Sequence, residues 1–395
     1  METETLERGT REVIPSSRLA RSKSAFYQPE IDSLRFGAFL GVFLFHSMPR
    51  ETGFYTAYHV PPSLAAVIGG AVSAGGCGVD LFFALSAYLI TSLLLKERET
   101  TGTLDVKGFY IRRILRIWPL YFAFVFFAYA APLLVHAQHT LSLRYVIGFT
   151  FLAGNWIYVF YGIPLHSVAL PLWSVSIEEQ FYLTWPLVAR RSSIMTLNVV
   201  AGLLLLAAAG TRAIFLFSGA SQASFEFNTL SRIDPIAMGI VLALFAKRLP
   251  RFTAVQRTVL LCLGISISVG VGMFCGLYPV DNISVNCWGN IIGRPLVAFA
   301  SIALLLSVLG IQSAWIRNQW LVYLGKISYG LYVFHELALK VANVLVKPEG
   351  MLRLTVWITL GLAITIALAA LSYRYLETPF LRMKERFAHV SSRPV

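Results

Sequence analysis

Residues 33–49 read SLRFGAFLGVFLFHSMP, an apolar segment that carries two ionisable side chains, Arg35 and His46. Eleven residues are about three turns of an α-helix, so both side chains lie on one face, about 16 Å apart along the axis. An arginine and a histidine inside a membrane-spanning helix are energetically costly and usually mark function. The segment therefore predicts chemistry within a membrane, on a substrate long enough to reach from Arg35 to His46.

The composition is that of a membrane protein. The 395 residues are 56% hydrophobic and 13% charged, whereas a soluble domain carries about 25% charged residues. The net charge of +13 comes from basic residues that flank apolar segments, so membrane topology explains it better than nucleic-acid binding. The four cysteines form no CxxC pair and no metal spacing with histidine. We therefore expect membrane lipids as partners, no nucleic acid and no bound metal.

The expected fold is all-α, a polytopic bundle of transmembrane helices in the cell (inner) membrane. We expect ten spans, at residues 33–49, 77–95, 117–136, 173–189, 194–217, 231–246, 257–279, 291–311, 321–345 and 353–373. Ten spans put every basic loop and both termini on the cytoplasmic side. The apolar stretch 143–161 is interrupted by Gly148, Gly154 and Asn155, and we expect it to be re-entrant or interfacial. The domain limits are a basic tail at 1–30, a membrane domain at 31–379 and a second tail at 380–395.

Carboxylates enter the fourth span from its outer end, in the segment WSVSIEEQFY at 173–182. On the expected topology Glu178 and Glu179 can reach the depth of His46, and we expect them to take part in catalysis. Ser174, Glu178 and Tyr182 share a helix face, and we expect Ser174 and Tyr182 to contact substrate. A carboxylate beside an imidazole fixes its tautomer and raises its basicity. The alternative is a structural buried pair or the lining of a water-filled cavity.

Three further segments carry polar groups with two interpretations each. Asp80, in GGCGVDLFF at 75–83, binds a substrate hydroxyl or caps a helix, and the glycines allow close backbone approach. The arginines of FYIRRILRIWPLY at 109–121 bind a polyphosphate or lipid head groups; they are Arg112, Arg113 and Arg116. His335, in KISYGLYVFHE at 326–336, is a satisfied interior residue or a catalytic partner that contacts substrate.

Arg232, Asp234 and Arg294 are the remaining charges expected inside the bundle. Each lies in or beside an apolar span, where an unpaired charge is costly. We expect them to form interior pairs or to contact the acceptor.

Taken together, these segments resemble the acyltransferase 3 family of integral membrane acyltransferases. The family's R-x10-H pair and its later motifs match in order at residues 31–46, 78–90, 109–121, 173–186, 327–335 and 373–379. Two departures stand out, because Ala87-Tyr88 replaces the family's Gly-Phe and Glu336-Leu337 replaces the Trp-Pro that often follows the late histidine.

The resemblance implies transfer of an acyl group from a cytoplasmic donor, usually acyl-CoA, to a hydroxyl of a glycan or related acceptor. It implies essential roles for Arg35, His46 and the arginines after the second span. Acyl-CoA is then a co-substrate, and we expect no other cofactor. Some relatives carry an SGNH-type hydrolase domain after the bundle, which we do not expect here because the chain ends shortly after its last span.

Our hypothesis for the mechanism combines the positions of the charged residues with what the family resemblance implies. Arg112, Arg113 and Arg116 dock the phosphates of CoA near Arg35, and His46 acts as general base on the acceptor hydroxyl, with an acyl-His46 relay as the less favoured variant. A transporter or flippase of a glycan or lipid-linked precursor is the alternative, although the sequence contains no inverted repeat that would favour it. A catalytically silent membrane partner is a third reading, against which the intact Arg35 and His46 argue.

Overall fold

The structure, a computed structural model, describes residues 27–134, 140–277 and 286–387, and all regular elements within these ranges are helical. The expected all-α class is confirmed. The expected tails at 1–30 and 380–395 lie largely outside the described residues.

The α-helices are α1 (Pro29–Ser47), α2 (Thr52–Thr56), α3 (Pro62–Ala74), α4 (Gly78–Thr101), α5 (Val106–Leu134), α6 (Leu143–Thr150), α7 (Gly154–Tyr161), α8 (Leu172–Arg191), α9 (Ile194–Ser218), α10 (Gln222–Phe227), α11 (Asp234–Phe245), α12 (Ala254–Phe274), α13 (Cys287–Val308), α14 (Gln319–Lys326), α15 (Ser328–Leu345), α16 (Met351–Ser372) and α17 (Thr378–Lys384). Short 3-10 turns lie at η2 (Gly75–Cys77), η3 (Leu230–Arg232), η4 (Ala246–Arg248) and η6 (Glu385–Phe387), and η5 (Tyr373–Glu377) is a π-helix.

Six helical segments are long and apolar enough to cross a membrane, at Pro62–Thr101, Val106–Leu134, Ile194–Ser218, Ala254–Phe274, Trp288–Val308 and Met351–Phe387. They match six of the ten expected spans, so the count of ten is not confirmed. The other four expected spans form α1, α8, α11 and the pair α14–α15, which are shorter or carry more polar side chains.

Two expected boundaries are wrong. The second span begins at Pro62 rather than at residue 77, because α3 continues through the 3-10 turn η2 into α4. The expected span 321–345 is two helices that break at Ile327, where α14 ends and α15 begins. The break lies directly after a point where α14 comes very close to α1. A Cβ atom at Gly325 would collide there with the backbone of Asp32. The sequence alone does not reveal either feature, because both depend on packing against α1.

The interrupted stretch 143–161 forms two short helices, α6 and α7, each of 8 residues. At 1.5 Å per residue such a helix is about 12 Å long, which is less than half of the hydrocarbon core. The structure thus agrees that this stretch is not a continuous span. Gln180 of α8 donates a hydrogen bond to Asn155 Oδ1 at 2.9 Å, so the interrupted backbone is held against protein.

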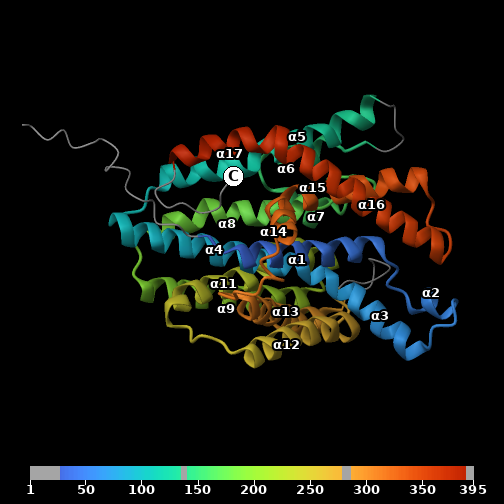
Figure 1. Ribbon diagram of the computed structural model, residues 1–395, viewed down its shortest axis with the longest axis horizontal. Helices are drawn as coiled ribbons and strands as arrows, with labels where there is room; N and C mark the ends of the chain where they lie inside the picture. Colours follow the sequence, from blue (N-terminus) through green and yellow to red (C-terminus); the bar gives the residue numbers. More distant parts are fainter. Residues whose placement is uncertain (1–26, 135–139, 278–285, 388–395) are drawn as a thin grey trace, which may run out of the picture.

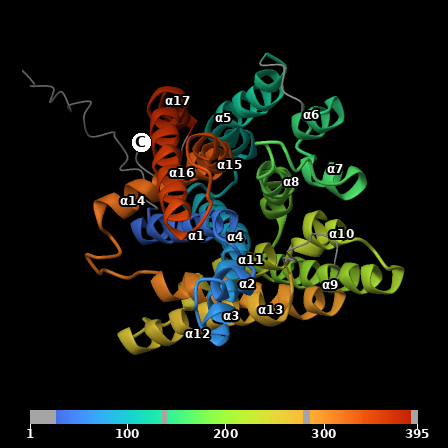
Figure 2. The same ribbon diagram turned by 90° about the vertical axis from the view of Figure 1, so that its right-hand side faces the viewer.

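Helix α1 lies in the middle of the bundle, with α4 on one side and α14 and α15 on the other (Figures 1 and 2). Its start suits a helix, because Pro29 occupies the first turn and Glu30 and Asp32 favour the positive end of the dipole. Glycines let α1 pack closely: a Cβ at Gly75 would meet the carbonyl oxygen of Gly41. The helix that carries Arg35 and His46 is therefore enclosed by the bundle.

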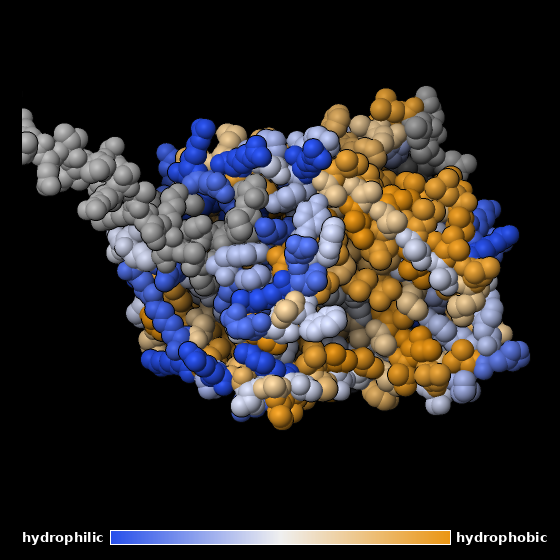
Figure 3. Space-filling model, in the orientation of Figure 1, coloured by the Kyte–Doolittle hydropathy of each residue, from blue (hydrophilic) through white to orange (hydrophobic). Residues whose placement is uncertain are grey.

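Hydrophobic and hydrophilic residues separate along the long axis of the molecule, with the hydrophilic surface at the left of Figure 3. Hydrogen bonds and ion pairs connect the basic loops at this end. Arg98 at the end of α4 donates to the carbonyl of Ser192 after α8 at 2.7 Å, and Lys247 pairs with Glu99 at 2.5 Å. We call this end of the molecule the basic end.

Candidate active site

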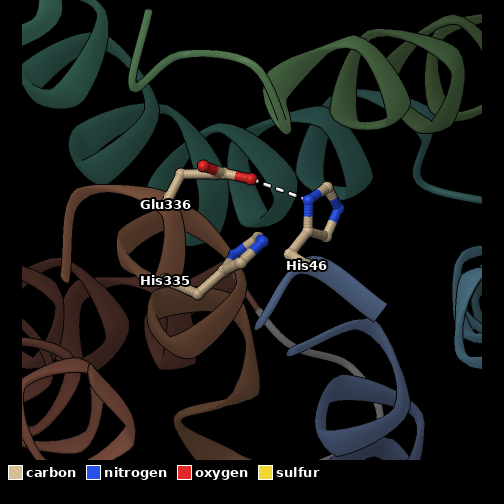
Figure 4. Close-up of side chains that lie close together, drawn as sticks. All are labelled: His46, His335 and Glu336. Atoms are coloured by element: carbon tan, nitrogen blue, oxygen red, sulfur yellow. Dashed lines mark ion pairs between the residues drawn. The ribbon is translucent and has the colours of Figure 1, made fainter. Parts of the chain in front are cut away.

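His46 lies in the last turn of α1 and faces Glu336 of α15 (Figure 4). Its Nδ1 is 2.7 Å from Glu336 Oε1, and the two side chains are 26% and 13% exposed. A carboxylate accepts from a ring N–H, so Nδ1 carries the hydrogen and the lone pair resides on Nε2. This arrangement holds the imidazole in the tautomer that a general base needs.

His335, the residue before Glu336, is fully buried and lies against His46. The two ring centroids are 5.1 Å apart. His335 Nδ1 is 2.6 Å from the Tyr332 carbonyl oxygen, which can only accept, so this ring also has its lone pair on Nε2. That Nε2 is buried and has no hydrogen-bond partner among the described residues. His335 is thus an interior residue that also presents an unused acceptor beside His46.

Glu336 occupies the position that the sequence analysis gave to Glu178 or Glu179, and that expectation is corrected. Glu178 Oε1 accepts a hydrogen bond from Ser86 Oγ at 2.8 Å, and Glu179 Oε2 accepts one from Trp118 Nε1 at 3.0 Å. Both carboxylates lie on α8, which packs on α4 and α5, whereas α15 packs on α1. Similar depth in a membrane does not determine which helices are neighbours.

Arg35 stands between two adjoining pockets that share it and Glu178. The pocket toward the basic end is also lined by Arg113, Arg116 and Tyr182. The pocket toward the middle of the bundle is also lined by Ser174, Ser328 and Tyr332. The expected shared face of Ser174, Glu178 and Tyr182 therefore borders these pockets, while substrate contact by these residues stays a prediction.

Tyr332 connects the second pocket with the histidines. Its hydroxyl lies 2.7 Å from Ser174 Oγ, its carbonyl binds His335, and its ring centroid is 5.6 Å from that of His335. Arg35 Nε donates to Ser328 Oγ at 3.1 Å, one turn earlier on α15. A line of polar groups thus leads from the arginines of α5, past Arg35, to His335 and His46.

Arg112 does not belong to this line. Its guanidinium pairs with Glu97 at 2.8 Å and donates to the carbonyl oxygen of Phe387 at 2.6 Å. Both partners of the ion pair are buried, and Arg112 is not among the residues of either pocket. Of the three arginines expected to bind phosphate, Arg113 and Arg116 border the pocket, whereas Arg112 is neutralised by Glu97 at the end of α4. Phosphate binding itself stays a prediction.

Asp80 is buried in an ion-pair network and neither caps its helix nor borders the two pockets. It pairs with Arg232 at 3.1 Å, and Arg232 also pairs with Glu226 at 2.8 Å. The network continues from Glu226 to Arg294, while Arg212 pairs with Asp234 at 2.5 Å. The expectation of interior pairs for Arg232, Asp234 and Arg294 is confirmed. Asp80 thus forms an ion pair rather than a helix cap, and its expected contact with substrate stays a prediction.

The ligand atoms of His46, His335 and Glu336 lie within 4.8 Å of one another, a grouping that could hold a metal ion. Two ligands of a tetrahedral zinc ion, each about 2.05 Å from the metal, are roughly 3.3 Å apart. The 2.7 Å between His46 Nδ1 and Glu336 Oε1 is shorter and fits a direct hydrogen bond.

The structure thus defines a helical membrane protein with a partly exposed imidazole–carboxylate pair and an arginine-lined pocket. The family model described as an acyltransferase domain matches residues 28–374, and the chain belongs to this acyltransferase family. Family membership favours an acyltransferase over the transporter or flippase alternative.

Curated relatives carry a more specific activity in their names. A protein of Staphylococcus aureus strain MSSA476, named "Putative O-acetyltransferase SAS0844", is 27% identical over 393 residues, covering 94% of this chain and 60% of the relative. The "O-acetyltransferase OatA" of strain NCTC 8325 is 26% identical over 381 residues, covering 92% of this chain and 58% of the relative. The chain thus spans about three fifths of these relatives' length. No solved structure matches the chain.

Sequence reasoning missed the role of Glu336. Its signal was present, since Glu336 is a carboxylate in an apolar helix, directly after His335, where the family often has tryptophan. A carboxylate in such a place needs a partner, and the structure supplies His46.

Proposed function

We propose that the protein is an O-acetyltransferase of the cell membrane that transfers an acetyl group from acetyl-CoA to a hydroxyl of a carbohydrate or glycolipid acceptor. The basic end faces the cytoplasm, with both termini, and receives the donor. The names of the relatives support the acetyl group and oxygen acceptor. The line of polar groups from Arg113 and Arg116 to His46 is the observation that supports the proposal, because it connects guanidinium groups, which suit phosphates, to an imidazole, which suits a general base.

The donor binds along this line. Its phosphates contact Arg113 and Arg116, whose guanidinium groups border the pocket at the basic end. Arg35, shared by both pockets, contacts the donor where it leaves the arginine-rich end. The extended pantetheine arm then brings the thioester toward His46, about 16 Å further along α1 by helical rise.

His46 acts as general base in a direct transfer. Its Nε2 removes the proton of the acceptor hydroxyl while the hydroxyl oxygen attacks the thioester carbonyl. The tetrahedral intermediate collapses by breaking the carbon–sulfur bond, and the CoA thiolate takes the proton from the imidazolium. Glu336 holds the ring and stabilises its transient positive charge. The orphaned Nε2 of His335 is placed to accept a hydrogen bond from the acceptor.

The test compares cells that contain the wild-type chain with cells that contain His46→Ala. Surface glycans and lipids are analysed by mass spectrometry, and the purified full chain in nanodiscs is assayed for CoA release from acetyl-CoA. We expect His46→Ala to lower transfer by at least ~100-fold, as loss of a general base does, while the protein remains folded in the membrane. Near-normal acetylation by this variant would overturn the proposal.

His59→Asn provides the matched control. His59 is exposed and has a positive φ of 61°, a conformation that asparagine tolerates. We expect this variant to transfer acetyl groups at the wild-type rate. Incubation with acetyl-CoA alone, followed by mass spectrometry of the intact protein, separates direct transfer from a relay, because only a relay leaves an acetyl group on His46.

A further inference from the structure

Lys384, the last residue of α17, has a buried side chain that the proposed mechanism does not use. It is 7% exposed, whereas Arg382, Met383 and Glu385 beside it are exposed. Lysine is rarely buried unless its ammonium group is paired. Within residues 27–134, 140–277 and 286–387, Lys384 forms no ion pair or hydrogen bond. A side chain that is mostly buried, with an ammonium group that has no partner among these residues, indicates a place for an anion that comes from outside the chain.

The groups around Lys384 are mainly cations of α5. Arg116, Arg113 and Arg112 all act on it electrostatically, opposed by its chain neighbour Glu385. Arg112 is already neutralised by Glu97. Arg113 and Arg116 have no ion pair among the described residues, and both border the pocket at the basic end. Glu179 and Glu377 offset part of the charge of Arg113 and Arg116, and Lys384 adds a third cation beside these two arginines.

The local fold brings Lys384 to this position by two devices. The π-helix η5 inserts one extra residue before α17, which rotates the following helix face by about 100° relative to an uninterrupted helix. The hydrogen bond from Arg112 to the carbonyl of Phe387 then ties the end of this segment to α5. Figure 1 shows α17 lying along α5 near the basic end. π-Helical turns of this kind are frequent at functional sites.

We propose that Lys384 is a phosphate ligand that extends the donor site from Arg113 and Arg116 toward α17, beyond the residues that border the pocket itself. The inference rests on the proposed function for the identity of the donor. An ammonium group binds phosphate as a point charge with three donors, and it complements the planar guanidinium forks of the arginines. A nucleotide-containing thioester such as acetyl-CoA supplies the required phosphates.

The experiment measures KM and kcat of the full chain in nanodiscs with two donors. Acetyl-CoA carries phosphates, and acetyl-pantetheine carries the same thioester without them. Lys384→Met keeps the buried stem and removes the charge. We expect it to raise KM for acetyl-CoA about tenfold, the effect of one charge-assisted hydrogen bond. Its KM for acetyl-pantetheine and its kcat stay at the wild-type values. Lys384→Arg restores most of the affinity, and Arg382→Gln, an exposed change on the same helix, alters neither donor.

The inference is overturned if Lys384→Met leaves KM for acetyl-CoA unchanged, or raises KM equally for both donors, since the second result indicates a structural role. A binding measurement separates this failure from failure of the proposed function. Inorganic pyrophosphate is added to wild type and Lys384→Met, and the shift in melting temperature is recorded. If wild type transfers no acetyl group but its pyrophosphate shift disappears in Lys384→Met, the anion site stands and the proposed function fails.

Discussion

Glu336 is the residue whose removal tests the imidazole–carboxylate pair without removing the base. Glu336→Gln keeps a hydrogen-bonding group 2.7 Å from His46 but removes the negative charge that stabilises the imidazolium. We expect kcat to fall about 10–100-fold, as for other residues that orient a reactive group. KM for acetyl-CoA should change little, because Glu336 does not border either pocket. Steady-state kinetics of the purified variant measure both quantities.

Glu349→Gln is the control for this change. Glu349 is exposed and pairs with Arg353 on the surface at 3.4 Å, where an ion pair contributes little. A wild-type kcat for Glu336→Gln would show that His46 does not depend on its carboxylate. A loss of folded protein in Glu336→Gln but not in Glu349→Gln would assign Glu336 a structural role instead.

Variants of Glu97 and Arg113 test whether Arg112 is structural while Arg113 and Arg116 bind the proposed donor. Glu97→Gln leaves the Arg112 guanidinium buried and without its carboxylate, which costs about 3–5 kcal/mol of stability. We expect a clearly lower melting temperature for Glu97→Gln by thermal unfolding in detergent. Arg113→Gln should instead raise KM for acetyl-CoA while the melting temperature stays near wild type. The assignment fails if Glu97→Gln melts normally and shows the donor-binding defect.

Single side chains were predictable where one helix determines their relation. Arg35 and His46 lie on one helix, and Arg113 and Arg116 lie near Arg35 as expected. Among relations between helices, the proximity of Arg35 to the arginines of α5 was predictable because all lie near the same membrane surface, but the other pairings were not, because hydropathy gives depth but not neighbours. The partner of His46 is therefore Glu336 rather than a glutamate of α8. The pairing of Arg112 with Glu97 was not predictable either, because nothing in the sequence of α5 distinguishes Arg112 from Arg113.

At the scale of elements, close glycine contacts determine where α1 sits against the turn η2 that leads into α4. A side chain at Gly75 would collide with the Gly41 backbone and with Phe45. Gly75→Val should separate the two elements at a cost of about 1–3 kcal/mol. The shift should also move His46 relative to Glu336. We expect a lower melting temperature together with a lower kcat.

Gly37→Ala is the matched control, because a Cβ atom at Gly37 on the same helix meets no other atom within 4 Å. Replacing this glycine within a helix should leave activity unchanged and stabilise the protein by about 0.5–1 kcal/mol. If Gly75→Val retained both wild-type stability and wild-type kcat, the close contact between α1 and η2 would not position the site.

Helix prediction succeeded best for the outer helices. The apolar windows of α9 and α12 are only 17% and 11% buried within the protein, so their sequences are uniformly apolar and easily recognised as lipid-facing. The inner helices α1, α8 and α15 carry the polar groups of the site and bury them against protein. Their sequences therefore resemble membrane spans less. The polar side chains that form the site also lower the hydropathy of the helices that carry them, so these helices are harder to recognise as membrane spans.

At the scale of the whole molecule, the basic loops gather at one end of the helices and the His46–Glu336 pair lies toward the other. Arg317 joins the basic end through Glu30 at the start of α1, at 2.8 Å. The positive-inside rule predicts that this end faces the cytoplasm. The donor would then enter from the cytoplasm, and the acetyl group would be transferred toward the outer side.

Single cysteines at the two ends of α9 test this orientation. Arg191, which precedes α9, and Ser218, its last residue, are both exposed, and 25 helical residues separate the ends of α9 by about 37 Å. Arg191→Cys and Ser218→Cys are made separately in a background where Cys77, Cys262, Cys275 and Cys287 are alanine. A membrane-impermeant maleimide should label Ser218→Cys in intact cells, and Arg191→Cys only after the membrane is permeabilised. The background protein must retain acetyl transfer and take up no label.

The reverse labelling pattern would place the basic end outside the cell. Acetyl-CoA from the cytoplasm could then not reach Arg113 and Arg116, and the proposed direction of transfer would be wrong.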